Sequence, residues 1–225
     1  MAEGLLVVVL PPRYLGSVEY YAAMAAANVA VIDINMRYDK RRKDVHRCTI
    51  AGTHGPLQLT VPVNTPHGLT DASGARRVLT WQDIPVSAHN HWWTLHQNAL
   101  ESAYGRCPYF EHYYPDIRAI LDDRWVGQPV TLLDTALDAL IRRQLGLTTR
   151  LSATIPLGQA VTPAQPSECI PTGHAVTPVR ADIESIQVEP YRQLRQDTQG
   201  FMPHMSILDL LFNLGPNVLS HLSRT

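Results

Sequence analysis

A compact group of basic side chains between residues 37 and 47 is the strongest chemical signal in the sequence. The segment carries a local net charge of +4, from six basic and two acidic residues: Arg37, Lys40, Arg41, Arg42, Lys43 and Arg47 against Asp39 and Asp44. Arginine binds phosphate or carboxylate through a planar fork, and lysine binds them as a point charge. The segment is short for contact with a duplex, so we expect a small anionic ligand rather than nucleic acid. A solvated loop is the alternative.

Four of the ten histidines lie within residues 89–112, at His89, His91, His96 and His112. Imidazole titrates near neutrality and suits general acid–base chemistry. A metal site would require several of these side chains to converge within about 2.1 Å of one ion. His91 and His96 are five residues apart and do not share a helix face. We therefore predict no metal ligands and no cofactor, and a metal hydrolase is a further alternative.

Aromatic residues are concentrated in the same region, including Trp92, Tyr104 and Tyr109. Core packing explains most of them, and a wall that stacks on a sugar or a base is the alternative. Cys107 is either a nucleophile or a small buried hydrophobic side chain, and burial is the commoner role. Asp209 and Asn213 stand four residues apart in an apolar helical segment. Asp209 fits a capping role there, whereas a buried Asn213 would need a hydrogen-bond partner.

The composition excludes several classes of protein. The formal charge is −1, from 19 basic and 20 acidic residues, whereas nucleic-acid-binding domains are usually strongly basic. No run approaches the roughly 20 apolar residues that cross a bilayer. The common phosphate-loop, dinucleotide, nucleophile-elbow and zinc-protease motifs do not occur. Three widely spaced cysteines form no disulfide framework, so we expect a cytoplasmic protein with free thiols.

Elements at the start of the chain would position the basic segment. The apolar run 5–10, a helical stretch capped by Ser17 and the apolar run 29–34 have the size of a right-handed βαβ unit. Residues 57–63 alternate between apolar and polar types, which predicts a half-buried strand. With residues 48–51 they would form a hairpin around a loop at 52–56.

The rest of the chain is predominantly helical. We predict a short strand at 81–86, helices at 91–104 (capped by Asn90), 109–123 and 132–145, and a helix after Ser206 that ends at Gly215. Residues 64–80 read as a mobile loop and 155–190 as an irregular proline-rich segment. The expected fold is a single α/β domain over 1–225, with a mixed, partly parallel sheet, packed helices and this long irregular excursion.

Several motifs occur in order along the chain. They are Leu10-Pro11-Pro12-Arg13-Tyr14-Leu15-Gly16, Tyr38-x-Lys40-Arg41, Val45-His46-Arg47-Cys48-x-Ile50, Gly55-Pro56-Leu57-x-Leu59-Thr60-Val61-Pro62-Val63, His91-Trp92-x-x-Leu95, Ser102-Ala103-Tyr104, Pro108-Tyr109-Phe110-Glu111 and Leu208-Asp209-Leu210-Leu211-Phe212-Asn213-x-Gly215-Pro216. In order and spacing these motifs resemble those of the WbqC-like family of bacterial proteins. The resemblance spans nearly the whole chain except 64–80 and 150–190. Two features depart from it: family members tend to start with Gln-Pro-x-Tyr, whereas this chain has Leu10-Pro11-Pro12-Arg13-Tyr14, and they usually carry asparagine where His46 stands.

The resemblance implies a setting in O-antigen or other surface polysaccharide biosynthesis. Our leading hypothesis is a group transferase that acts on a nucleotide-activated sugar or amino sugar. Lys40 and Arg47 would hold the phosphates, and His91 or His46 would act as general base. Tyr14, Trp92 and Tyr104 are further substrate-binding candidates, with Trp92 as a stacking wall. Glu111 would orient the base or bind a sugar hydroxyl.

Asp209 and Asn213 would give polar support to that site. The alternative is a non-catalytic binding or assembly protein of the same pathway. An enzyme would gather Lys40, Arg47, His91 and Glu111 around one concave pocket, whereas a binding module would need an exposed apolar patch. The sequence leaves the oligomeric state open.

Overall fold

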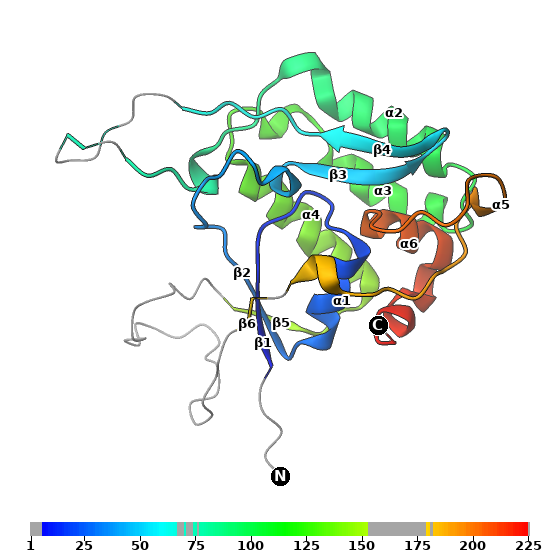
Figure 1. Ribbon diagram of the computed structural model, residues 1–225. Coiled ribbons are helices and arrows are strands. Elements are labelled where there is room, and N and C mark those ends of the chain that lie inside the picture. The colour runs from blue at the N-terminus through cyan, green and yellow to red at the C-terminus, as the bar shows by residue number, and fades with distance from the viewer. Residues whose placement is uncertain are drawn as a thin grey trace, which may run out of the picture.

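The computed structural model describes residues 6–66, 70, 74–75, 77–152, 179–180 and 182–224. Two separate sheets occur in this part of the chain (Figure 1). Four parallel strands have the order β5-β2-β1-β6, and β3 pairs with β4 in an antiparallel hairpin. With the helices that pack around these sheets, the α/β class is confirmed, with parallel and antiparallel pairings in different sheets. The predicted irregular segment falls largely outside the described residues.

The first three elements form the expected βαβ unit. Strand β1 (Val7–Leu10) is buried along its whole length and pairs in parallel with β2 (Val29–Ile32). Helix α1 (Val18–Ala26) connects them, and the Ser17 hydroxyl accepts from the backbone N–H of Tyr20 at its N-terminus. That cap satisfies one of the backbone donors that a helix start leaves open. The predicted helix cap and strand pairing are both confirmed.

The hairpin carries the second predicted pairing. Strand β3 (Arg47–Gly52) and β4 (Gly55–Thr60) are in register from Arg47 opposite Thr60 to Gly52 opposite Gly55. Gly55 has a φ of 122°, which a side chain-bearing residue rarely adopts. Because β3 ends at Gly52 and β4 begins at Gly55, residues 53–54 alone connect the strands, whereas a five-residue loop was predicted.

Helices surround the two sheets, and their bounds mostly follow the predicted segments (Figure 1). They are α2 (Trp92–Tyr104), α3 (Phe110–Ile120), α4 (Val130–Leu145), α5 (Gln196–Gln199), α6 (Ile207–Leu214) and α7 (Val218–Leu222). The two remaining strands of the parallel sheet are β5 (Arg150–Ser152) and β6 (Val179–Arg180). Helix α4 ends at Gly146, which has the left-handed conformation expected of a helix C-cap.

Two local predictions were wrong. Residues 81–83 form a turn of 3₁₀ helix instead of starting a strand, because the Asp83 carboxylate accepts from both the backbone and the hydroxyl of Thr80. This capping box favours a helical turn over an extended chain. Asn90 does not cap α2: Asn90 and His91 both have positive φ, and no side chain caps the helix.

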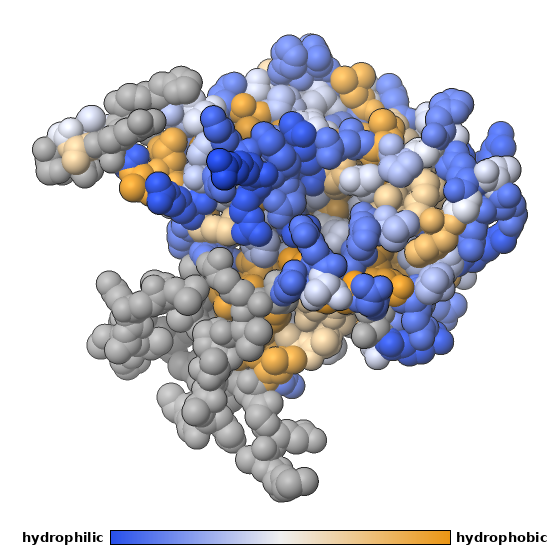
Figure 2. Space-filling view, viewed as in Figure 1, coloured by the Kyte–Doolittle hydropathy of each residue, from blue (hydrophilic) through white to orange (hydrophobic). Residues whose placement is uncertain are grey.

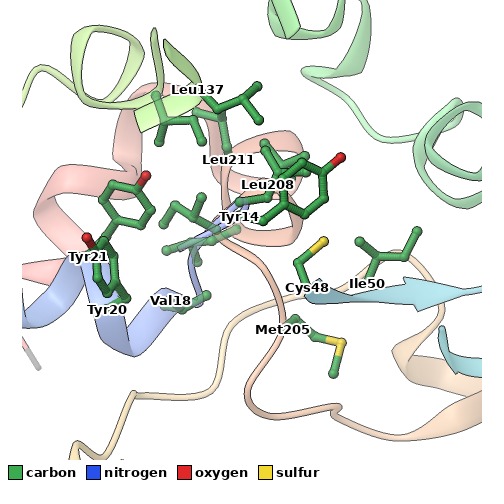
Figure 3. Close-up of a cluster of buried hydrophobic side chains, with 14 of the residues drawn as sticks. Tyr14, Val18, Tyr20, Tyr21, Cys48, Ile50, Leu137, Met205, Leu208 and Leu211 are labelled. Atoms are coloured by element: carbon green, nitrogen blue, oxygen red, sulfur yellow. The ribbon is translucent and has the colours of Figure 1, made fainter. Parts of the chain in front are cut away.

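The core lies between the hairpin, α1, α4 and α6. Tyr14, Cys48, Ile50, Leu208 and Leu211 converge there from three different segments (Figure 3). Tyr14 and Leu208 are both fully buried. Burying one such apolar side chain contributes about 1.5–3 kcal/mol, so this contact ties the chain after β1 firmly to α6.

Candidate functional site

A cleft of about 180 Å³ opens where three distant segments of the chain meet. They are residues 13–17 after β1, residues 43–49 at the start of the hairpin with Gln58 on β4 opposite Thr49, and residues 204–206 before α6. Backbone hydrogen bonds hold them together: Tyr14 N–H donates to the Val45 carbonyl at 3.2 Å, and Ser206 N–H donates to the Thr49 carbonyl at 2.7 Å. The walls of the cleft are thus fixed by main-chain contacts.

The topology explains why the cleft lies here. Residues 13–17 follow the carboxyl end of β1, and the segment after β2 leads to Lys43 and Asp44. Because β1 and β2 are parallel neighbours, the loops after both strands leave the same edge of the sheet. Ligands of open α/β sheets bind outside this carboxyl edge. The cleft therefore occupies the position that the sheet favours for a binding site.

Positive charge predominates in the cleft. Arg13, Lys43 and Arg47 line it together with one acid, Asp44, for a net charge of +2 without His204 (three minus one). Figure 2 shows strongly hydrophilic side chains gathered over the segment that leads into β3. A cleft with a cationic lining concentrates anions.

The two arginines of the cleft, Arg13 and Arg47, use only some of their hydrogen-bond donors within the described chain. Arg13 forms an ion pair with Asp44 (Nη2 to Oδ2, 3.1 Å), and Arg47 donates from Nη1 to the Gln58 side chain at 3.2 Å. The Nε atoms of both guanidinium groups are buried, and neither has a hydrogen-bond partner among the described residues. A buried donor without an acceptor costs about 1–3 kcal/mol, which an oxyanion ligand would recover.

The serines that line the cleft are engaged in structure. The Ser206 hydroxyl donates to the Leu15 carbonyl at 2.9 Å and accepts from the Leu208 N–H, so it caps α6. Ser17 caps α1 in the same way. Within the described chain neither hydroxyl forms a hydrogen bond with a histidine, as a serine nucleophile would with its base. The cleft has the features of a binding site for charge, not of a serine hydrolase.

Buried polar groups lie beneath the cleft. The Tyr14 hydroxyl is 2.8 Å from Nδ1 of His96, and burial lowers the pKa of His96 to about 4. Asp134 on α4 is buried, and within the described chain neither of its carboxylate oxygens has a hydrogen-bond partner. Desolvation, reinforced by the charges of Asp138 and Asp44, raises the pKa of Asp134 well above its usual value. His96 is therefore neutral near pH 7, and burial favours the neutral form of Asp134.

The structure brings Tyr14 and Arg47 to the cleft, as two of the predicted binding residues. The Tyr14 hydroxyl, however, is directed to His96 in the core. Lys40 is exposed and does not line the cleft, where Lys43 stands instead. The four residues expected to surround one pocket, Lys40, Arg47, His91 and Glu111, do not line a common cleft.

The two predicted bases have different surroundings. His46 is buried, donates from Nδ1 to the Val61 carbonyl at 3.0 Å, and has a pKa lowered mainly by desolvation. His91 is exposed, with its ring 5.2 Å from that of Trp93. Glu111 is exposed on α3. None of the three lines the cleft, so their catalytic roles stay predictions.

Trp92 and Tyr104 are core residues. Trp92 packs its ring edge-on against Tyr14, with centroids 6.5 Å apart, and is only 2% exposed. The Tyr104 hydroxyl accepts from the backbone N–H of Ala51 at 2.9 Å. Cys107 is buried, and desolvation raises its thiol pKa to about 12, which supports the packing role over the nucleophile.

Asp209 and Asn213 on α6 both form hydrogen bonds within the protein. Asp209 does not cap the helix through its carboxylate, which accepts from the Tyr191 hydroxyl at 2.6 Å and from Gln193 at 2.8 Å. The predicted capping role was wrong because these two buried donors compete for the carboxylate. Asn213 donates to the Asp209 carbonyl at 2.7 Å and accepts from the Cys107 thiol.

The histidine cluster does not converge. His96 is buried against Tyr14, whereas His89, His91 and His112 are exposed. In the described part of the chain no group of three or more histidine, cysteine, aspartate or glutamate side chains is placed to hold a metal ion. The arrangement gives no support to a metal hydrolase that uses these histidines.

Sequence reasoning did not single out Arg13, Lys43 or His204, which all line the cleft. Arg13 was within a recognised motif, and its position just after β1 was the available signal. Lys43 was one of six basic residues with no feature to distinguish it. His204 gave no signal, because its approach to the first loop is a long-range contact.

The fold and the cleft together define an α/β protein with a cationic site at the carboxyl edge of its parallel sheet. A model of the WbqC-like protein family matches residues 12–166, and the chain belongs to this family. The match includes the first two segments of the cleft, whereas residues 204–206 lie beyond it. Searches of curated proteins and of solved structures found no match. No helix among the described residues is long and apolar enough to cross a bilayer.

Proposed function

We propose that the cleft binds the phosphate or carboxylate group of a small anionic ligand. The observation that carries this proposal is the pair of buried, unpartnered Nε atoms of Arg13 and Arg47 in one cleft. Lys43 adds a third cation, and the half-buried Thr49 and the exposed Gln58 add neutral polar groups to the lining. Guanidinium groups and an ammonium form the donor set that recognises phosphoryl oxygens.

The ligand that fits this site best is the activated donor of a group transfer. The resemblance to the WbqC-like family points to surface polysaccharide biosynthesis, in which donors are carried on nucleotide phosphates. We therefore propose that the protein is a group transferase that acts on a nucleotide-activated sugar or amino sugar. In this proposal Arg13, Lys43 and Arg47 hold the phosphates, and the acceptor attacks from the side of His204. The cytoplasmic setting belongs to the same proposal and is supported by the free thiols of Cys48 and Cys107.

A thermal-shift panel of nucleotide sugars and inorganic phosphate tests this function. We expect at least one phosphate-bearing compound to raise the melting temperature of the wild type, and Lys43→Ala to reduce the affinity by about tenfold. Arg41→Ala is the matched control, since Arg41 is exposed in the same basic segment but does not line the cleft. Lys40→Ala in the same panel tests the prediction made from sequence.

The two possible roles of the site give different results. Stabilisation by nucleotide sugars over their free nucleotides would favour a donor site. Stabilisation by phosphate alone would favour the non-catalytic alternative. If no anion stabilises the wild type, or if Lys43→Ala and Arg41→Ala respond alike, the proposal is wrong.

A further inference from the structure

A second cleft, of about 280 Å³, adjoins the first and shares His204 with it. Its walls are largely apolar and come from α1 and from two segments of the chain between residues 184 and 204. The rings of Tyr191 and Phe201 meet edge to face in its lining, with centroids 5.4 Å apart. An apolar cavity with aromatic walls and a few polar groups is the usual form of a small-molecule site.

The charge of this second cleft is opposite to that of the first. Glu19 and Glu184 line it, and no lysine or arginine is among the described residues that do. The Glu19 side chain is only 5% exposed, and its Oε1 accepts from Nδ1 of His204 at 2.9 Å. The His204 side chain is 64% exposed, so a solvated imidazole is the single hydrogen-bond partner of this buried carboxylate within the described chain. One hydrogen bond only partly replaces the hydration that a buried carboxylate loses, so a cationic ligand would bind favourably here.

We propose that this second cleft binds a primary amine carried on an apolar or sugar-like body. The ammonium would be held by Glu19 at the base of the cleft, with Glu184 adding to the negative potential. The faces of Tyr191 and Phe201 would attract the same cation through their ring quadrupoles. An alcohol of the same shape would leave Glu19 without its counter-charge, so the site discriminates by charge.

His204 is held between the two clefts by its backbone. Its φ of 59° is unusual for a residue other than glycine, and such strained positions are concentrated at functional sites. The Glu19 carboxylate accepts from Nδ1, and among the described residues Nε2 has no hydrogen-bond partner. A carboxylate that orients an imidazole in this way is a recurring arrangement in general-base catalysis.

This inference rests on the proposed function for its chemistry and names the acceptor as an amine. The bound ammonium first gives one proton to Nε2 of His204, which frees the lone pair of the amine nitrogen. That nitrogen forms a bond to the transferred group of the donor, and the bond between that group and its phosphate breaks, with the electron pair leaving on the phosphate oxygen. The second proton lost by the nitrogen passes to solvent. The two clefts thus place an anionic donor and an amine on either side of one base.

Calorimetric titration with 2-phenylethylamine and its neutral counterpart 2-phenylethanol tests the amine site near neutral pH. We expect the amine to bind the wild type and the alcohol to bind at least about tenfold more weakly. Glu19→Gln keeps the size of the side chain and should abolish this preference. Glu189→Gln is the control, because Glu189 is exposed and does not line the cleft.

A second variant guards against misfolding of Glu19→Gln. Ile186 is half-buried in the cleft wall, and Ile186→Lys would place a competing ammonium there. It should also abolish amine binding, and its response to phosphate at the first cleft would report that it is folded. Equal binding of amine and alcohol by the wild type, or an unchanged preference in both variants, would overturn the inference. Phosphate binding without amine binding would refute the amine site and leave the proposed anion site intact. Amine binding without phosphate binding would refute the anion site and leave the amine site intact.

Discussion

At the residue scale, the protonation state of the buried His96 affects the stability of the protein. His96 is 4% exposed and lies against Tyr14 and Trp92. Its neutral form fits this environment, because a charged imidazole would lose its hydration without gaining a carboxylate partner. Tyr14, which lines the anion cleft, is therefore in contact with a histidine whose neutral form the fold requires.

Acid should destabilise the protein through His96. The folded pKa is about 4, whereas the unfolded value is about 6.5, so the unfolded state takes up the proton first as the pH falls. The stability linked to this residue is present above pH 6.5 and is lost as the pH falls toward 4. We expect the contribution of His96 to the free energy of unfolding to fall by about 2 kcal/mol between about pH 7 and about pH 5, read as the difference between the wild type and His96→Gln.

Urea unfolding at the two pH values measures this loss. His96→Gln should lack the component, whereas His112→Gln, which alters an exposed histidine on α3, should keep the wild-type dependence. If His96→Gln is as sensitive to acid as the wild type, the neutral buried imidazole is not the cause.

Residue types were easier to predict than residue positions. The basic segment was recognised, but the side chains that reach the cleft are Lys43 and Arg47 and not Lys40. Lys43 begins a 3₁₀ turn over Lys43–Val45, just before Arg47 at the start of β3, and no pattern in the sequence marks that turn. The sequence therefore did not indicate which of the basic side chains line the cleft.

At the scale of elements, the C-terminal end of α6 depends on one glycine. Gly215 has a φ of 55°, and a β-carbon at this position would lie 2.5 Å from the ring of Tyr109. Tyr109 N–H also donates to the Phe212 carbonyl at 3.2 Å, so α3 and α6 meet closely here. The predicted C-cap is confirmed, and the contact with Tyr109 adds a packing reason for glycine.

Gly215→Ala should destabilise the protein by about 2–5 kcal/mol. The left-handed backbone contributes about 1–2 kcal/mol of this cost, and overpacking against Tyr109 contributes about 1–3 kcal/mol. Gly146→Ala is the control for a positive φ, since Gly146 has a φ of 69° and open space around a β-carbon. Thermal unfolding of the two variants gives the comparison, and equal losses would contradict the packing argument.

Helices and strands with strong patterns were predictable because local propensity and burial agree. The run of apolar residues at β1 and the helical spacing in α4 both led to the observed elements. The prediction failed at 81–83, where a side chain to backbone hydrogen bond decided the conformation. Such contacts outweigh a short apolar run and leave little trace in periodicity.

At the scale of the whole molecule, the cleft requires segments almost 200 residues apart. The Ile207 N–H donates to the Gly16 carbonyl at 2.8 Å, and the Val18 N–H donates to the Met205 carbonyl at 3.0 Å. These contacts bring His204 and Ser206 to the loop after β1. The fold class could be predicted from local patterns, whereas the site could not, because its third wall arises only from this long-range pairing.

The most direct test of the central claim is calorimetric titration of inorganic phosphate into the wild type, Arg47→Met and Arg41→Met. Methionine keeps much of the length of the arginine side chain and removes its donors, and Gln58 is the one hydrogen-bond partner that Arg47 loses within the described chain. We predict that Arg47→Met weakens phosphate binding by about 10- to 100-fold, as expected for a hydrogen bond to a charged group. Arg41→Met should bind like the wild type. Equal affinities for all three proteins would contradict an anion site built on the buried guanidinium groups.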